Sequence, residues 1–195
     1  MKNELGLLLP DVPWENIEKK IRRDCQKQKD PERAQQFNII KGRILFDYIR
    51  KNNVLFREFP MPFGPTLPDD KNIKFWHDRI GIKSGVAFSL FLDFRSQSGI
   101  DSSITRKIVF SIQKAFVLSQ DPDLDSVLPC IINILGSKKK GFYLEEHIYE
   151  GNDFLDITEI NNLLLSVYDD WLRILDEVSA PVKKTGTDDR NYRLF

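Results

Sequence analysis

One stretch of the sequence, residues 85–99, constrains the fold more than any other because its side chains alternate with a period of two. It reads GVAFSLFLDFRSQSG. In a β-strand successive side chains point to opposite faces. Every second residue from Val86 to Phe94 is apolar, so these residues form one wholly apolar face. The other face is mostly apolar until it ends in Asp93 and Arg95. A strand that is apolar on two faces belongs inside a covered sheet, so we expect residues 86–95 to form a central strand of a mixed sheet.

The flanking sequence carries start signals for several helices. Asp30 followed by Pro31 is typical of a helix N-terminus, and Ser103 is expected to cap a later helix. Asp156, with Glu159 three residues on, has the pattern of a capping box. The expected helices are residues 13–27, 31–53, 104–120 and 156–178. The expected strands are residues 54–59, 73–80, 86–95, 127–135 and 141–150.

Apolar residues recur at helical spacing in three of these helices, which predicts one apolar side on each. The stripe of the second helix should pack on a core, and that of the third should be buried. The predicted stripes are Phe37, Ile40, Ile44, Leu45 and Tyr48; then Ile104, Ile108, Ile112 and Ala115/Phe116; and finally Ile160, Leu164, Val167/Tyr168, Trp171, Leu175 and Val178.

Length and composition limit the number of domains. With 195 residues, of which 41% are hydrophobic, the chain can bury one core. We predict a single α+β or α/β domain over residues 1–179, built on a central mixed β-sheet of about five strands flanked by helices. The element order is α-α-β-β-β-α-β-β-α. Residues 180–195 are predicted to form a polar C-terminal tail.

Charge and cysteine content exclude several classes of protein. The 29 basic and 29 acidic side chains cancel, so a polyanion would have to be bound by a local patch. Cys25 and Cys130 lack the spacing of a zinc site or a disulfide scaffold. No apolar run approaches the roughly 18 residues of a membrane span. We therefore expect a soluble protein of the reducing cytoplasm, without a membrane partner.

The charges that end the central strand suggest a metal site. Asp78 closes the preceding predicted strand, so a hairpin would bring it near Asp93 at one end of the sheet. Two carboxylates at a sheet edge suit a hard cation such as Mg²⁺, with waters and a phosphate supplying further oxygens.

These residues and the element order resemble the PD-(D/E)XK nuclease superfamily. The resemblance implies that Asp78 and Asp93 are the two metal-binding acids and that the carbonyl of Phe94 is a further Mg²⁺ ligand. Arg95 stands where the family has its lysine, and a lysine of the following helix, Lys107 or Lys114, is a candidate replacement. The implied function is a metal-dependent endonuclease, or an inactive relative, acting on nucleic-acid phosphodiesters. The chain differs from the family at His77, which stands where the family has a proline.

A second interpretation needs no catalysis. Asp93 and Arg95 can form a salt bridge at the end of a sheet, and the lysines of SKKKG (137–141) can be a solvated turn or touch a phosphate backbone. The chain would then be a protein-interaction module, such as a subunit, adaptor or immunity-type inhibitor.

The C-terminal tail offers such a module an anchor. Tyr192, Leu194 and Phe195 end an otherwise polar segment, so we expect the tail to be ordered by docking into a groove of this chain or of a protein partner. A plain frayed terminus is the alternative.

Overall fold

The computed structural model describes residues 7–8, 12–58, 79–95 and 99–179. The helices are α1 (Trp14–Cys25), α2 (Pro31–Lys51), α3 (Ser103–Phe116) and α4 (Ile157–Ser179). The strands are β1 (Leu7–Leu8), β2 (Leu55–Glu58), β3 (Arg79–Lys83), β4 (Val86–Asp93), β5 (Leu128–Ser137) and β6 (Gly141–Ile148). Two short 3-10 turns, Leu118–Gln120 and Pro122–Leu124, lie between α3 and β5.

The strands form one mixed sheet in the order β1-β2-β3-β4-β5-β6. All neighbours are antiparallel except β4 and β5, which are parallel. A parallel pair needs a crossover connection, and α3 supplies it. The predicted α+β domain, its mixed sheet and its element order are confirmed, with the two-residue β1 as an addition. The prediction that β4 is a central strand is also confirmed.

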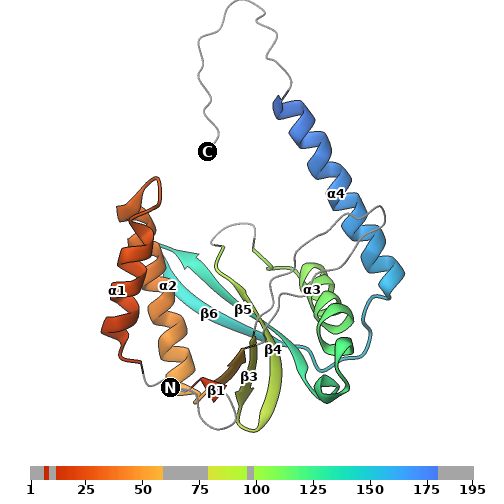
Figure 1. Cartoon of the computed structure of the whole chain (residues 1–195), viewed down its shortest axis with the longest axis horizontal. Coiled ribbons are helices and arrows are strands. Elements are labelled where there is room, and N and C mark those ends of the chain that lie inside the picture. Colours follow the sequence, from red (N-terminus) through yellow and green to blue (C-terminus); the bar gives the residue numbers. More distant parts are fainter. Residues whose placement is uncertain (1–6, 9–11, 59–78, 96–98, 180–195) are drawn as a thin grey trace, which may run out of the picture.

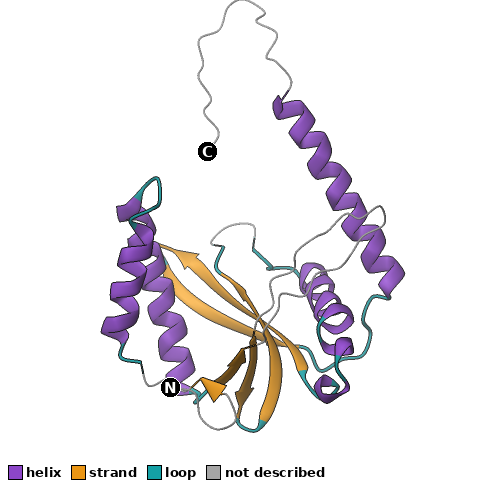
Figure 2. Cartoon of the chain, viewed as in Figure 1, coloured by secondary structure: helices purple, strands orange, loops and turns teal. Residues whose placement is uncertain are grey.

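Helices cover both faces of the sheet (Figure 1). On one face the side chains of α2 pack over Phe88 and Leu90 of β4 and their neighbours on β5. On the other, Phe110 of α3 lies against Ile131 of β5. Figure 2 shows the resulting layers, with α1 and α2 on one side of the strands and α3 on the other. This double cover explains why β4 is apolar on both faces.

Two of the three predicted caps are confirmed. The Asp30 carboxylate accepts a hydrogen bond from the backbone of Arg33 at 3.1 Å. Asp156 and Glu159 bond each other's backbone N–H at 2.8 Å in a capping box. The third prediction is wrong by one residue, because α3 is capped by Ser102, whose hydroxyl accepts from Thr105 N.

The predicted buried stripe of α3 is correct only in part. Ile112 is buried, but Ile104 is 72% exposed. A polar residue takes a place in the buried face instead: Gln113 is fully buried and donates to the carbonyls of Ser89 and Cys130. Buried strand carbonyls accept hydrogen bonds, and the pattern of apolar residues does not reveal that a side chain of this helix donates to them.

Some predictions fall on parts of the chain that are not described. Residues 73–78 and the tail at 180–195 lie outside the described residues, so the division into a domain of residues 1–179 and a tail stays a prediction. Among the described helices, none is long and apolar enough to cross a membrane. The cytoplasmic location stays a prediction as well.

Candidate functional site

The Asp93 carboxylate at the end of β4 is a buried acceptor of four hydrogen bonds. Oδ1 accepts from Arg95 Nε at 2.8 Å and from Arg95 N at 3.1 Å. Oδ2 accepts from Arg95 Nη2 at 3.1 Å and from Ile100 N at 2.8 Å. A Cβ at Gly99 would lie 2.9 Å from Oδ2, so a glycine is needed there. The carboxylate therefore ties together Arg95, which follows β4, and Ile100, which precedes α3.

The hydrogen bonds also decide the charge state of Asp93. Burial raises the pKa of this carboxyl, but the Arg95 guanidinium and the backbone N–H groups of Ile100 and Arg95 together lower it below its usual value. With both oxygens accepting two hydrogen bonds each, a carboxylate has used its four lone-pair positions. Asp93 thus acts as a structural anion.

Lys41 of α2 is the second charged group buried at this end of the sheet, at 5% exposure. Its ammonium donates to the carbonyl of Phe94, the oxygen predicted to bind Mg²⁺. Burial lowers the pKa of Lys41, and the negative charge of Asp93 opposes that shift. The sequence pattern gives no sign that Lys41 is buried, because a lysine beside an apolar stripe is expected to extend its ammonium into solvent.

The remaining predicted site residues do not gather around Asp93. Lys107 of α3 pairs instead with Asp153 at 2.8 Å. Lys114 is half-buried on α3 and has no recorded contact with Asp93. Among the described residues, no three His, Cys, Asp or Glu side chains form a potential metal site. Asp78 lies outside them, so the site of Asp78, Asp93 and Phe94, and its Mg²⁺, stay predictions.

A second ionic cluster joins α2 to two strands. The Tyr48 hydroxyl and the Lys83 ammonium both donate to the Glu146 carboxylate, and Lys83 lies 3.3 Å from the Tyr48 oxygen. Burial raises the pKa of Tyr48, and the neighbouring Glu146 adds to the shift. Lys83 and Glu146 come from β3 and β6, which the sequence alone does not place near each other. This cluster fastens α2 to the sheet.

A surface cavity of about 690 Å³ lies between the start of α2, the end of β4 and the β5–β6 turn. None of the described residues that line it is acidic. Its cationic and aromatic lining residues are Arg33, Phe37, Arg95, Lys138, Lys139 and Phe142.

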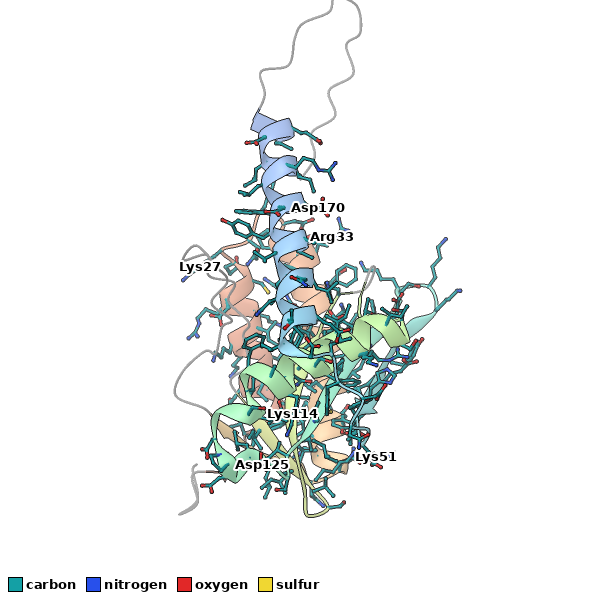
Figure 3. All side chains as sticks on the ribbon, turned by 90° about the vertical axis from the view of Figure 1, so that its right-hand side faces the viewer. Lys27, Arg33, Lys51, Lys114, Asp125 and Asp170 are labelled. Atoms are coloured by element: carbon teal, nitrogen blue, oxygen red, sulfur yellow. The ribbon has the colours of Figure 1, made fainter. Side chains whose placement is uncertain are left out.

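The outer half of α4 carries an exposed apolar surface, which we call the α4 face. Its residues follow one another at intervals of four, three and four: Val167 is 63% exposed, Trp171 51%, Ile174 52% and Val178 76%. Only the base of the helix is buried, at Ile160, and the rest extends away from the sheet (Figure 1). Asp170 lies on this extending part in Figure 3.

The α4 face is bordered by acidic side chains. Residues 167–178 contain Asp169, Asp170, Asp176 and Glu177 against the single cation Arg173. Neighbouring exposed apolar side chains that are rimmed by charged residues are typical of protein-interaction sites. The predicted stripe of this helix is therefore present, but in the described part of the chain nothing covers its outer half.

Comparison with known proteins gives a consistent result over nearly the whole chain. A family model described as sliding clamp-binding bacterial toxin SocB matches residues 2–180. The DNA replication inhibitor toxin SocB of Caulobacter vibrioides (strain NA1000 / CB15N) is 22% identical over 182 residues, covering 93% of this chain and 73% of that relative. No solved structure matches the chain significantly.

These matches overturn the resemblance to the PD-(D/E)XK nucleases. The predicted function, a metal-dependent nuclease or an inactive relative acting on nucleic-acid phosphodiesters, is wrong, because the matched family is one of clamp-binding toxins. The resemblance depended on two acids and an arginine at short spacing, and hydrogen bonds in the fold account for Asp93 and Arg95 without catalysis. The alternative from the sequence, a non-catalytic protein-interaction module, agrees better with these matches.

Proposed function

Because the chain belongs to the SocB family of sliding clamp-binding bacterial toxins, we propose that it binds the bacterial sliding clamp and inhibits DNA replication as a non-catalytic ligand of that clamp. The observation that carries the proposal is the family match over residues 2–180, which spans every described helix and strand. Inhibition then follows from occupying the clamp, with no bond in the DNA broken.

The chemistry at the end of β4 supports a non-catalytic role. A catalytic carboxylate must have a free oxygen for a metal or a proton, whereas both oxygens of Asp93 already accept hydrogen bonds. The cation beside it, Arg95, stays protonated and cannot exchange a proton. These groups suit the stabilisation of a loop.

The α4 face and the tail that follows it are the proposed contact with the clamp. The face lies inside the matched range and includes Trp171, and binding energy at protein interfaces concentrates in a few aromatic and aliphatic anchors. Tyr192, Leu194 and Phe195 of the tail extend the same apolar chemistry beyond α4. One partner surface therefore receives both segments.

Binding to the purified clamp, measured by calorimetry, tests this function. We expect one molecule of this chain to bind per clamp site, and we expect Trp171→Ala and deletion of residues 190–195 each to weaken binding. The matched control is Ile104→Ala, which removes an even more exposed apolar side chain from α3 and should bind normally.

The outcomes separate the function from its proposed surface. No binding by the unaltered chain would refute clamp binding itself. Normal clamp binding by both altered proteins would refute the contact through α4 and the tail. If the chain self-associates, and Trp171→Ala abolishes this self-association but leaves clamp binding intact, the α4 face would be assigned to a second copy of the chain.

A further inference from the structure

The cavity beside the end of β4 gathers positive charge on a chain whose net charge is zero. Three separate elements supply its cations: α2 provides Arg33, the end of β4 provides Arg95, and the β5–β6 turn provides Lys138 and Lys139. Since no carboxylate is among the described residues that line the cavity, an anion entering it meets cationic and neutral groups there. Such a local patch is what a chain without overall positive charge needs to bind a polyanion.

The fold keeps these cations in place. The bidentate contact with Asp93 fixes the Arg95 guanidinium. The β5–β6 turn is held by Gly136, whose φ of +114° and close approach to Gly141 exclude a side chain. Lys138 donates to Gln36 of α2 at 2.7 Å, which ties the turn to the helix that carries Arg33.

The charge of Arg95 is matched by Asp93, so three cations are left to neutralise a ligand. Within the described part of the chain, the side chains of Arg33 and Lys139 form no ion pair. Lys138 bonds only a neutral amide and lies over a ring. These three side chains can each contact a phosphate group.

The two aromatic rings of the cavity do not favour recognition of bases by stacking. Phe37 and Phe142 contact each other edge to face, with centroids 5.9 Å apart. Cations lie over both rings: Lys138 is 5.3 Å from the centre of Phe37, and Lys41 is 5.8 Å from the centre of Phe142. Stacking on single-stranded bases needs open ring faces, so the cavity suits a phosphate backbone better than unpaired bases.

We propose that this cavity holds consecutive phosphate groups of duplex DNA, independently of sequence and without cleaving the strand. We assign this class of ligand because three cations that form no ion pair within the described part of the chain are spread over a cavity much larger than one phosphate group. DNA is also the setting of the proposed function, because a clamp-bound inhibitor of replication lies beside duplex DNA. The contact itself requires no clamp, so it is tested on this chain alone.

Fluorescence anisotropy of a short labelled duplex, titrated with the full chain at several salt concentrations, tests the proposal. Three neutralised phosphates give a slope of log K against log salt of about −3. The double substitution Lys138→Ala/Lys139→Ala should reduce that slope by about two. Both altered residues are exposed, and circular dichroism verifies the fold.

The matched control is Lys19→Ala/Lys51→Ala, which removes the same charge from exposed sites elsewhere. Lys51 lies at the opposite end of α2 from Arg33 (Figure 3). The control should retain the full slope, and unlabelled duplexes of different sequence should compete equally well. Equal weakening in both double variants, or no binding at low salt, would overturn the proposal. Tighter binding of free nucleotides or of poly-glutamate than of duplex would assign the cavity to a different ligand.

Discussion

Helices α2 and α4 have similar apolar patterns in the sequence but opposite surroundings in the fold. Leu45, Tyr48 and Ile49 of α2 pack on the central core cluster, and Phe46 is buried where α2 meets α1. On the outer half of α4, Val167, Trp171, Ile174 and Val178 are exposed. An apolar stripe thus predicts a helix and its apolar side, but it does not say whether this chain or another molecule covers that side.

The two helices also differ in their polar contacts. From α2, Lys41 bonds the carbonyl of Phe94 and Tyr48 bonds Glu146 on β6. Among the described residues, the outer half of α4 forms one ion pair, and it lies within the helix itself, between Arg173 and Asp170. Stability should therefore depend on α2 and on the end of the sheet that it covers, whereas partner binding should depend on α4.

The largest effect on stability is expected from Phe46→Ala in α2. Phe46 is 8% exposed, and its ring centre lies 5.5 Å from that of Trp14. Removal of a buried aromatic ring leaves a cavity and costs about 3–5 kcal/mol of unfolding free energy. Chemical denaturation measures this change, and a loss of less than about 1 kcal/mol would contradict the burial of this helix.

A smaller loss is expected from Asp93→Ala. Asp93 is 4% exposed and accepts a hydrogen bond from Ile100 N in addition to its contacts with Arg95. Its removal leaves a buried N–H without a partner, and we expect a loss of about 2–3 kcal/mol, since Arg95 can still reach water. An unchanged denaturation midpoint would contradict the structural role of Asp93.

The pH dependence gives a second measurement on Asp93. Because its folded-state pKa is lowered, its contribution is fully present above the unfolded-state pKa of about 3.9. The contribution is lost as the pH falls from there through the folded-state pKa. Between neutral pH and pH 3, unaltered protein should therefore lose more stability than Asp93→Asn, and equal losses would contradict a lowered pKa.

The smallest effect on stability is expected from Trp171→Ala on the α4 face. Trp171 is 51% exposed, so truncation should change the unfolding free energy by no more than about 0.5 kcal/mol. A loss comparable to that of Phe46→Ala would remove the contrast between the two helices. It would mean that another part of this chain covers the α4 face.

Local signals explain why much of the fold was predictable. The alternation in residues 86–95 identified the central strand, and the signals at Asp30 and Asp156 identified two helix starts. Each depends on residues close in sequence. Neighbouring serines cannot be told apart in this way, so the cap of α3 was placed at Ser103 instead of Ser102.

The candidate site and the basic cavity depend on contacts between residues far apart in the sequence, which local patterns do not reveal. Lys41 meets the end of β4 from a helix more than fifty residues away, and the basic cavity combines α2 with the β5–β6 turn. From the sequence, Asp93 and Arg95 were compatible both with a metal site and with a salt bridge. The Ile100 N–H group that donates to Asp93 lies seven residues further along the chain, and no local pattern predicts this hydrogen bond.

The most direct test of the proposed function is DNA synthesis by a clamp-dependent polymerase in a purified system. The concentration of this chain that halves synthesis should rise in proportion to the clamp concentration, extra clamp should restore synthesis, and the template should stay intact. This result is expected because a non-catalytic ligand acts only by occupying the clamp. Inhibition at the same concentration whatever the amount of clamp, or cleavage of the template at substoichiometric protein, would contradict the account.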